Sequence, residues 1–410
     1  MFQRFIGVLS IIILWPIDLV ADEPTEAEAI RAVSEVYAAL PRMLNITWRE
    51  GPEYPLGIQD SAFAVIDSQI VSAGGFSRFP KEVLDKYPDT FEGESSGFTK
   101  VSFLFDSVKP AIGWTRIADV PGPPRQAAAA AVVGSDIYVI GGFNYSEPHT
   151  YTATYRLRRT GDQWKWETLN CELPWPICEA GVAVIGDQIY LVGGADYHTS
   201  PAAPDGAFGS ESGRNGESVG RGMLVLNTKQ LNKGWRRLAD TPGSPRCFTS
   251  CAAAGGKVYL LGGLHFAINA FHNVVDSWVY DPRSEQWSRL TDMPHGGNRR
   301  VVAYNDRYLI MLGGHRYGTT WNVDGTVSEA HTPEEKALGE MKHHIEPTVL
   351  VFDTRTNRIG TADPLLDKSS WPMATIRGNT IYCLGGEGGN RLWHPATFQI
   401  GKIKVIQERN

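Results

Sequence analysis

The chain has 410 residues, of which 42% are apolar, and a formal net charge of -6 at pH 7. Its 39 Lys and Arg residues form neither a run nor a stripe and are outnumbered by 45 Asp and Glu residues, so composition gives no support for a nucleic-acid partner. Five cysteines, an odd number, do not make a disulfide framework.

The first residues form a pattern typical of a secretory signal peptide. Met1 to Arg4 supply a basic start, Phe5 to Trp15 an apolar core, and Leu19 to Ala21 a small-residue cleavage site. The apolar run is too short to span a bilayer, and no later stretch is long enough. We therefore predict an exported protein, periplasmic or secreted, with residues 1–21 as its signal peptide and no membrane span after cleavage.

The next segment, residues 22–43, carries Ala, Glu and Leu at helical spacing, which indicates a short helix or a flexible leader. It is followed by Asn45 to Arg49, which reads as a strand and contains Trp48.

The rest of the chain repeats one pattern: a turn, a short apolar strand with an aromatic residue, and a pair of glycines. Residues 134–142 read Gly-Ser-Asp-Ile-Tyr-Val-Ile-Gly-Gly. A second apolar run follows, as in Asp276 to Arg283, and then in several copies a tryptophan such as Trp287. Such regularity indicates a repeat architecture. The glycine pairs begin at Gly74, Gly141, Gly193, Gly262, Gly313 and Gly385.

This pattern is similar to the kelch repeat, and the chain resembles kelch β-propellers over nearly its whole length. The resemblance implies one four-stranded blade for each repeat, because a twisted sheet buries its faces against its neighbours around an axis. The last repeat ends at Phe398 and Val405 without a tryptophan, which Trp48 can supply. We therefore predict an all-β fold, a six-bladed kelch β-propeller over residues 44–410, with its ring closed by an N-terminal strand.

In such a blade, the loop after the glycine pair and the connector into the first strand lie at the same face, beside the central channel. The spacing of the glycine pairs is alternately long and short. The extra residues follow the first, third and fifth pairs, at Phe76 to Lys100, Ala195 to Arg221 and His315 to Pro347. Three long loops on alternate blades would form a collar around a pocket. Mobile surface insertions are the alternative interpretation.

Polar and aromatic residues at these two positions suit a carbohydrate site, because rings stack on sugars while Arg, Glu and His bind hydroxyls and move protons. The candidate catalytic residues are Glu179, His315 and Glu387. The candidate substrate-binding residues are Arg299, Arg300, Arg316, Tyr317, Tyr145, Tyr197, His198, His265 and Asp60.

Other features have structural interpretations. The Pro-Arg steps at Arg125 and Arg246 recur with the repeat, so they either brace blades or bind ligand. His343 and His344 have no third ligand at defined spacing, and we predict neither a metal nor a cofactor. Motifs of serine hydrolases, kinases and dinucleotide-binding enzymes are absent. A bridge between Cys171 and Cys178 is left open.

Among exported kelch propellers, the chain resembles the bacterial sugar mutarotase family typified by N-acetylneuraminate epimerase. The likeness rests on the signal pattern, the N-terminal closure, the long loops and a last blade containing Leu384-Gly-Gly-Glu-Gly-Gly389. It implies ring opening and closing at an anomeric carbon, with Glu179, Glu387 or His315 as acid or base and arginines such as Arg299 and Arg316 holding a carboxylate. That family's own Glu and Arg pair is not matched here, so neither is carried over.

Three alternatives stay open. A propeller-type polysaccharide lyase would use His315, Arg316 and Tyr317, or Tyr197 and His198, as base, clamp and acid. A copper radical oxidase needs a cysteine crosslinked to a tyrosine, and no cysteine is plainly placed for it. A non-enzymatic scaffold would bind a protein or glycan partner in place of a small-molecule or oligosaccharide ligand.

Overall fold

The computed structural model describes residues 37–77, 91–92, 97–146, 148–161, 163–197, 219–267, 270–329, 343–388 and 394–406. The predicted signal peptide at 1–21 and most of the predicted leader at 22–43 lie outside these residues, as does much of each predicted long loop. Among the helices that the structure describes, none is long and apolar enough to cross a membrane.

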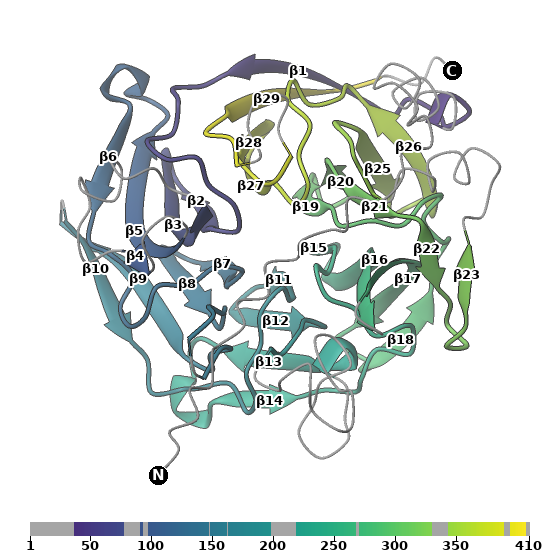
Figure 1. Ribbon diagram of the computed structural model, residues 1–410, viewed down its shortest axis with the longest axis horizontal. Coiled ribbons are helices and arrows are strands. Elements are labelled where there is room, and N and C mark those ends of the chain that lie inside the picture. The colour runs from purple at the N-terminus through teal and green to yellow at the C-terminus, as the bar shows by residue number, and fades with distance from the viewer. Residues whose placement is uncertain are drawn as a thin grey trace, which may run out of the picture.

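The described residues form six sheets of four or more strands around a central axis (Figure 1). In each sheet one strand lies nearest the axis, and each of these inner strands contacts the inner strands of both neighbouring sheets. The structure is therefore the all-β propeller that the repeats predict. The inner strands are β2 (Ala62–Ile66), β7 (Ala129–Val133), β11 (Gly181–Ile185), β15 (Cys251–Ala254), β19 (Arg300–Tyr304) and β27 (Met373–Arg377).

Antiparallel strands follow outward in each sheet. The second strands are β3 (Gln69–Ser77), β8 (Asp136–Ile140), β12 (Gln188–Val192), β16 (Lys257–Ala267), β20 (Tyr308–Leu312) and β28 (Thr380–Leu384). The third are β5 (Gly97–Asp106), β9 (Thr154–Thr160), β13 (Met223–Asn227), β17 (Ala270–Asp281), β25 (Val349–Asp353) and β29 (Phe398–Val405). The outermost are β6 (Trp114–Ile117), β10 (Gln163–Thr168), β14 (Trp235–Arg237), β18 (Gln286–Arg289), β26 (Arg358–Ala362) and β1 (Leu44–Glu50).

Several short strands and 3₁₀ turns are added to these six sheets. Strand β4 (Phe91–Glu92) pairs with β5, and β22 (Thr319–Trp321) and β23 (Val327–Glu329) widen the sheet beside β17. Strands β21 (His315–Tyr317) and β24 (His343–Ile345) pair with each other. The described 3₁₀ turns are η1 (Pro110–Ile112), η3 (Val219–Arg221) and η4 (Leu231–Lys233).

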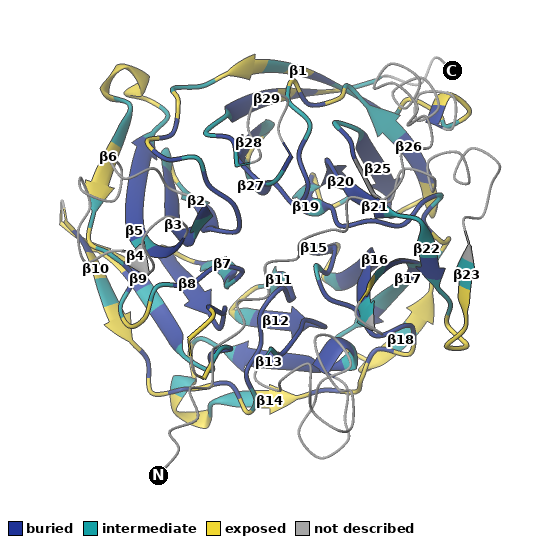
Figure 2. Ribbon diagram, viewed as in Figure 1, coloured by how far each residue is buried: buried dark blue, intermediate teal, exposed yellow. Residues whose placement is uncertain are grey.

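Burial explains which residues form which strand. The second strand β8 is buried at every position, because both of its faces pack against neighbouring blades. The outer strands are exposed along much of their length (Figure 2). The inner strand β7 is rich in alanine, which suits the narrow space near the axis where six strands converge.

The N-terminal strand β1 is the outer strand of the sheet that ends the chain. It pairs antiparallel with β29 from Leu44 to Glu50. It also contacts the preceding sheet, because Ile46 N donates to Asp363 Oδ2 at 2.6 Å and Trp48 Nε1 donates to the Asp363 carbonyl at 3.1 Å. The strand therefore joins the start of the chain to two neighbouring sheets.

The glycine pairs join each blade to the next. The amide of the second glycine donates to a carbonyl in the following blade's connector, for example Gly142 to Ile177 at 2.9 Å. A Cβ on Gly141 would lie 2.1 Å from the same carbonyl oxygen, and its φ is +66°, so the position requires glycine. The matching bonds are Gly75 to Arg125, Gly194 to Arg246, Gly314 to Ser369 and Gly386 to Ile58, and Gly263 bridges to Gly297.

The two Pro-Arg steps brace their own blades. Arg246 is fully buried, and its guanidinium donates to the carbonyls of Gly262 and Asp276 at 3.1 and 2.9 Å and pairs with the Asp276 carboxylate at 2.5 Å. Arg125 donates to the carbonyl of Gly141 at 3.0 Å in the same way. These side-chain contacts lie within one blade, while the backbone carbonyls of Arg125 and Arg246 accept hydrogen bonds from Gly75 and Gly194 of the preceding blade.

All five cysteines are buried and free. Cys171 and Cys178 therefore do not form the bridge that their spacing left open.

We expect Gly141→Ala to lower the free energy of unfolding by about 3 kcal/mol or more, since it adds a steric clash to the strain of a positive φ. Gly134→Ala is the matched control, because Gly134 has a φ of +59° with nothing within 4 Å of an added Cβ. That change should cost about 1–2 kcal/mol. Urea denaturation measures both, and equal losses would contradict the inter-blade role of the glycine pair.

Candidate functional site

Five of the six connectors share an unusual backbone conformation at one end of the channel. A residue just before the inner strand has a positive φ without being glycine, which is uncommon and marks a constrained position. The residue before it forms a β-bridge with the residue after the glycine pair, as Cys178 does with Ala195. Connector and loop thus meet at one face, as predicted. The positive-φ residues are Asp60 (54°), Ala127 (54°), Glu179 (56°), Phe248 (45°) and Trp371 (46°).

Backbone hydrogen bonds link these residues from blade to blade. Ala127 N donates to the Asp60 carbonyl at 2.9 Å, and Glu179 N donates to the Ala127 carbonyl at 3.0 Å. Thr249 N continues the series to the Glu179 carbonyl at 3.2 Å. The spacing of the side chains at this channel mouth is therefore fixed by main-chain bonds.

Three carboxyl groups gather here. Asp60 and Glu179 are 6% and 4% exposed, and Glu387, which follows the last glycine pair, is partly buried. The Tyr197 hydroxyl donates to Glu179, with distances of 3.0 and 3.1 Å to the two carboxyl oxygens. Gln59 Nε2 donates to Asp60 Oδ2 at 3.0 Å. We call Asp60, Glu179 and Glu387 the acid cluster.

Burial raises the pKa of each member of the acid cluster. It brings the pKa of Glu179 and of Glu387 to about 8, with repulsion from Asp60 acting in the same direction. It raises the pKa of Asp60 to about 6, against the opposing effect of Arg300. At neutral pH the cluster therefore holds one ionised carboxylate, Asp60, and two protonated carboxyls.

Arg300 is the cation that acts on Asp60. It starts β19 at a register position where other inner strands have small residues such as Ala62, Ala129 and Gly181. Its guanidinium carbon lies 4.1 Å from the centroid of the Trp371 ring. Burial lowers the pKa of Arg300 to about 10, and Asp60 opposes this effect, so the side chain stays charged at neutral pH.

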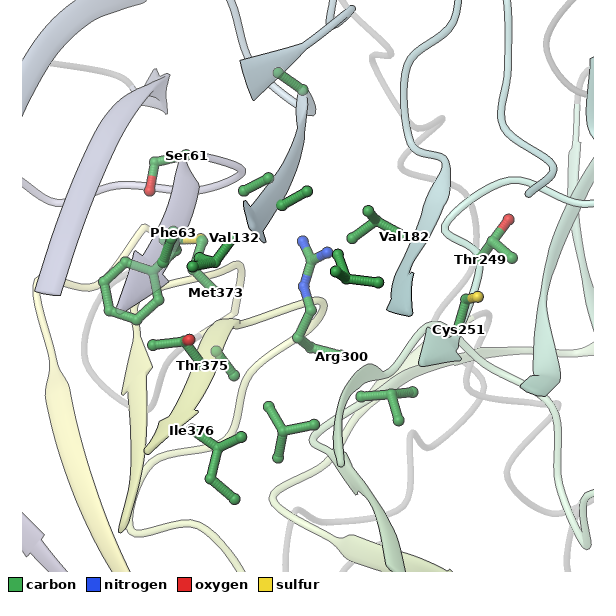
Figure 3. Close-up of a pocket in the computed structure, with 18 residues that line it drawn as sticks. Ser61, Phe63, Val132, Val182, Thr249, Cys251, Arg300, Met373, Thr375 and Ile376 are labelled. Carbon is green, nitrogen blue, oxygen red and sulfur yellow. The ribbon is translucent and has the colours of Figure 1, made fainter. Parts of the chain in front are cut away.

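A cavity of about 290 Å³ lies between the inner strands, with Arg300 reaching into it (Figure 3). Most of its walls are apolar, as with Val132, Val182 and Ile376, while Ser61 and Thr249 line it beside Arg300. The acid cluster does not line this cavity. Its carboxyls lie where the connectors enter the channel, so the mouth is acidic and the interior apolar.

Aromatic rings surround the acid cluster. Phe248 contacts Trp371 edge-on, with centroids 5.4 Å apart, and Phe271 at 5.9 Å. Phe271 in turn lies 5.4 Å from Tyr317. On another side, Tyr197 packs on Phe143 at 4.9 Å. Tyr145, which is 71% exposed, rests on Phe98 at 4.9 Å. The mouth therefore offers rings for stacking.

The structure brings several predicted residues together and separates others. Tyr317 belongs with the acid cluster, since Glu387 and Glu179 join burial in raising the pKa of its hydroxyl. His315 stacks on Tyr317 at 4.5 Å. His265 is fully buried, with Nδ1 3.0 Å from the Pro245 carbonyl and its ring 4.2 Å from Trp321. His198 lies outside the described residues.

Arg299 and Arg316, expected to bind substrate, instead lie in a separate interior cluster. Both pair with Glu346, which is fully buried, and Arg316 does so at 3.5 Å. Arg299 also donates to the Tyr37 hydroxyl at 3.1 Å and to the Gly296 carbonyl at 3.0 Å. The positive charges of Arg299 and Arg316 are therefore paired with the Glu346 carboxylate inside the blade.

Sequence reasoning missed Gln59, Cys247 and Phe248. Phe248 has a positive φ, as Glu179 does. The Cys247 thiol hydrogen-bonds the Glu179 carboxyl. Counting back from each glycine pair would have found them, because Gln59 and Cys247 occupy one register position of the connector and Phe248 the next. Within the described residues, no three His, Cys, Asp or Glu side chains gather to hold a metal.

We expect the acid cluster to make stability fall as pH rises. Glu179 has an ordinary pKa of 4.5 when unfolded and about 8 when folded, so its contribution is complete below pH 4.5 and is lost as pH rises towards 8. Glu179→Gln should flatten this dependence and be the more stable protein at pH 9. Urea denaturation at pH 5, 7 and 9 measures it, with exposed Glu53→Gln as the control; parallel curves for wild type and Glu179→Gln would contradict the buried, protonated carboxyl.

Comparison with known proteins agrees with this architecture. A family model described as "Kelch motif" matches residues 124–154 and 245–294. Kelch-like protein 15 of Danio rerio is 28% identical over 276 residues, which are 66% of this chain. The chain spans 41% of the length of that relative.

Bacterial relatives match more of their own length. N-acetylneuraminate epimerase of Pasteurella multocida is 23% identical over 395 residues, covering 87% of this chain and 94% of that protein. The epimerase of Yersinia enterocolitica is 32% identical over 102 residues, or 24% of this chain and 26% of that protein. The solved structure of YjhT has a TM-score of 0.61 at 15% identity, covering 87% and 99% of the two chains. The chain thus carries kelch motifs at these residues and has the β-propeller fold, and N-acetylneuraminate epimerases are among its relatives.

Proposed function

We propose that the channel mouth binds a carbohydrate and catalyses its mutarotation, the exchange of anomers through the open-chain form. The observation that carries the proposal is a carboxylate and a protonated carboxyl held in one cluster. Asp60 is ionised at neutral pH, whereas Glu179 is protonated. Two carboxyls whose environments separate their pKa values can serve as base and acid together.

The reaction needs one proton taken and one given. Asp60 accepts the proton of the anomeric hydroxyl while Glu179 gives its proton to the ring oxygen, which breaks the ring C–O bond and leaves a carbonyl. Rotation about the adjacent C–C bond exposes the other face of the carbonyl. The reverse transfers close the ring and restore both carboxyls, so no cofactor or net proton is consumed.

The surroundings support binding of a sugar ring. Phe248 and Tyr317, which are partly exposed, present aromatic surface for its apolar C–H face. The Tyr197 hydroxyl, bonded to Glu179, keeps that carboxyl oriented. The N-acetylneuraminate epimerase relatives are consistent with a carbohydrate substrate. Export remains part of the proposal, on the N-terminal pattern alone.

The lyase alternative has less support from the geometry. Its proposed clamp, Arg316, pairs with Glu346 in the interior, and His315 is buried against Tyr317. A uronate carboxylate would have no free arginine from this triplet.

We expect the purified protein to accelerate anomer exchange of at least one free sugar, measured by NMR exchange spectroscopy on a panel of neutral sugars, amino sugars, uronates and N-acetylneuraminate. Glu179→Gln and Asp60→Asn should each lower the rate by about 10²–10⁴-fold. The pH profile should be bell-shaped, because Asp60 is protonated below about pH 6 and Glu179 ionises above about pH 8.

Glu53→Gln is the control. It changes an exposed residue between β1 and β2 and should leave the rate unchanged. The proposal fails if no sugar on the panel exchanges faster than in buffer, or if both cluster variants keep the full rate.

A further inference from the structure

Arg300 is a partly buried arginine whose hydrogen-bonding capacity the fold does not use up. Its Nε donates to the Pro372 carbonyl at a long 3.4 Å, and the guanidinium lies over the Trp371 ring. Among the described residues, none accepts a hydrogen bond from its two terminal nitrogens, and no carboxylate forms an ion pair with it. The N–H groups of these two nitrogens are therefore left without a protein partner.

Two other buried arginines of the propeller show what full use of a guanidinium looks like. Arg125 donates from each of its three nitrogens to a protein oxygen, at 3.0 to 3.2 Å. Arg246 also donates from all three and pairs with the Asp276 carboxylate. A donor or a charge that is removed from water without a partner costs free energy. An acceptor from outside the chain would therefore be stabilised at Arg300.

The guanidinium of Arg300 reaches into the cavity between the inner strands. The cavity has a volume of about 290 Å³, and the guanidinium lies near the middle of the residues that line it (Figure 3). The side chains around it come from other blades and are mostly apolar, as with Val132, Val182 and Ile376. The cavity thus combines one cation with apolar walls.

Few polar groups of the cavity wall are left for a ligand. The hydroxyls of Ser61 and Thr249 are already hydrogen-bonded, to Ser72 Oγ at 2.9 Å and to the Arg246 carbonyl at 3.3 Å. Thr375 adds a further hydroxyl. A polyhydroxylated ring would leave several of its own hydroxyls without partners here, which is costly, whereas an aliphatic chain would not.

We infer that this cavity binds an aliphatic carboxylate, with the carboxylate on the terminal nitrogens of Arg300 and the chain between the apolar inner strands. The planar guanidinium matches the two oxygens of a carboxylate, and hydrogen bonds between such charged groups are strong. The apolar walls bind the chain by the hydrophobic effect. Since a cavity of about 150 Å³ holds benzene, this one has room for about eight carbons. The site is separate from the proposed sugar site and does not depend on it.

Asp60 is the anion that a bound carboxylate would meet. It acts on Arg300 without forming an ion pair with it, and its Oδ2 accepts a hydrogen bond from Gln59 Nε2 at 3.0 Å. Within the part of the chain that the structure describes, Arg300 is the one charged residue that lines the cavity. Loss of the Asp60 charge should therefore strengthen carboxylate binding, whereas loss of the Arg300 charge should weaken it. Adsorption of a chain to an apolar surface would respond to neither change.

Octanoate, 1-octanol and acetate test the two parts of the ligand separately. Binding to the whole protein is measured by NMR titration at pH 7.5 and low salt, following the Arg300 side-chain N–H signals. Octanoate should bind about tenfold or more tightly than octanol, because the alcohol brings no charge to the guanidinium. It should bind at least about a hundredfold more tightly than acetate, which has no chain to bury.

Arg300→Met keeps an unbranched side chain and removes the charge, so its octanoate affinity should fall to within about twofold of its octanol affinity. Arg283→Met is the matched control, because it removes an arginine from the exposed turn between β17 and β18 and should bind octanoate as wild type does. Val182→Phe fills the cavity and should weaken octanoate binding about tenfold or more while Arg300 stays in place. Asp60→Asn should strengthen it. Circular dichroism and the melting temperature check folding, and Val182→Phe keeps the test valid if Arg300→Met does not fold.

The inference is overturned if octanoate binds no more tightly than octanol, if Arg300→Met binds it as wild type does, or if N-acetylneuraminate binds at Arg300 more tightly than octanoate. Anomer exchange of a sugar without octanoate binding would overturn it and leave the proposed mutarotase in place. Octanoate binding that depends on Arg300, without exchange of any sugar, would uphold the cavity site and refute the mutarotase.

Discussion

The hydrogen bond between a glycine pair and the next blade's connector holds neighbouring blades in register around the channel. Gly142 reaches the Ile177 carbonyl, and Gly386 of the last blade reaches Ile58 of the first. These bonds hold each connector against its neighbour's loop. Because Gly141 has no room for a side chain, the blades can approach only with glycine there.

The same bonds place the candidate site. A connector held at both ends has little freedom, and its residue before the inner strand adopts a positive φ, as Asp60 and Glu179 do. Main-chain bonds then set the distances between carboxyls from different blades. Burial raises the pKa values of these carboxyls to different extents. At neutral pH the cluster therefore holds an ionised Asp60 and a protonated Glu179.

Charge is divided between interior and mouth. Arg246 with Asp276 and Arg299 with Glu346 are buried pairs inside blades, where removing one partner would leave an uncompensated charge. The mouth keeps carboxyls with Arg300 as the nearby cation. Arginines in these repeats therefore support the fold at some positions and face the channel at another. Arg299 in the connector and Arg300 at the start of β19 are neighbours in the sequence but have these two different roles.

The all-β propeller, the strand patterns and the face where connectors meet loops could all be predicted from the sequence, because glycine pairs and apolar runs are local features that repeat. The sequence also named Asp60, Glu179, Glu387, Tyr197, Tyr317 and Arg300, which the structure gathers at the channel mouth or its walls. The roles of Arg299, Arg316 and His265 were decided only by tertiary structure. Whether a polar side chain meets Glu346, a backbone carbonyl or the channel depends on residues far away in the chain, and no local pattern contains that information.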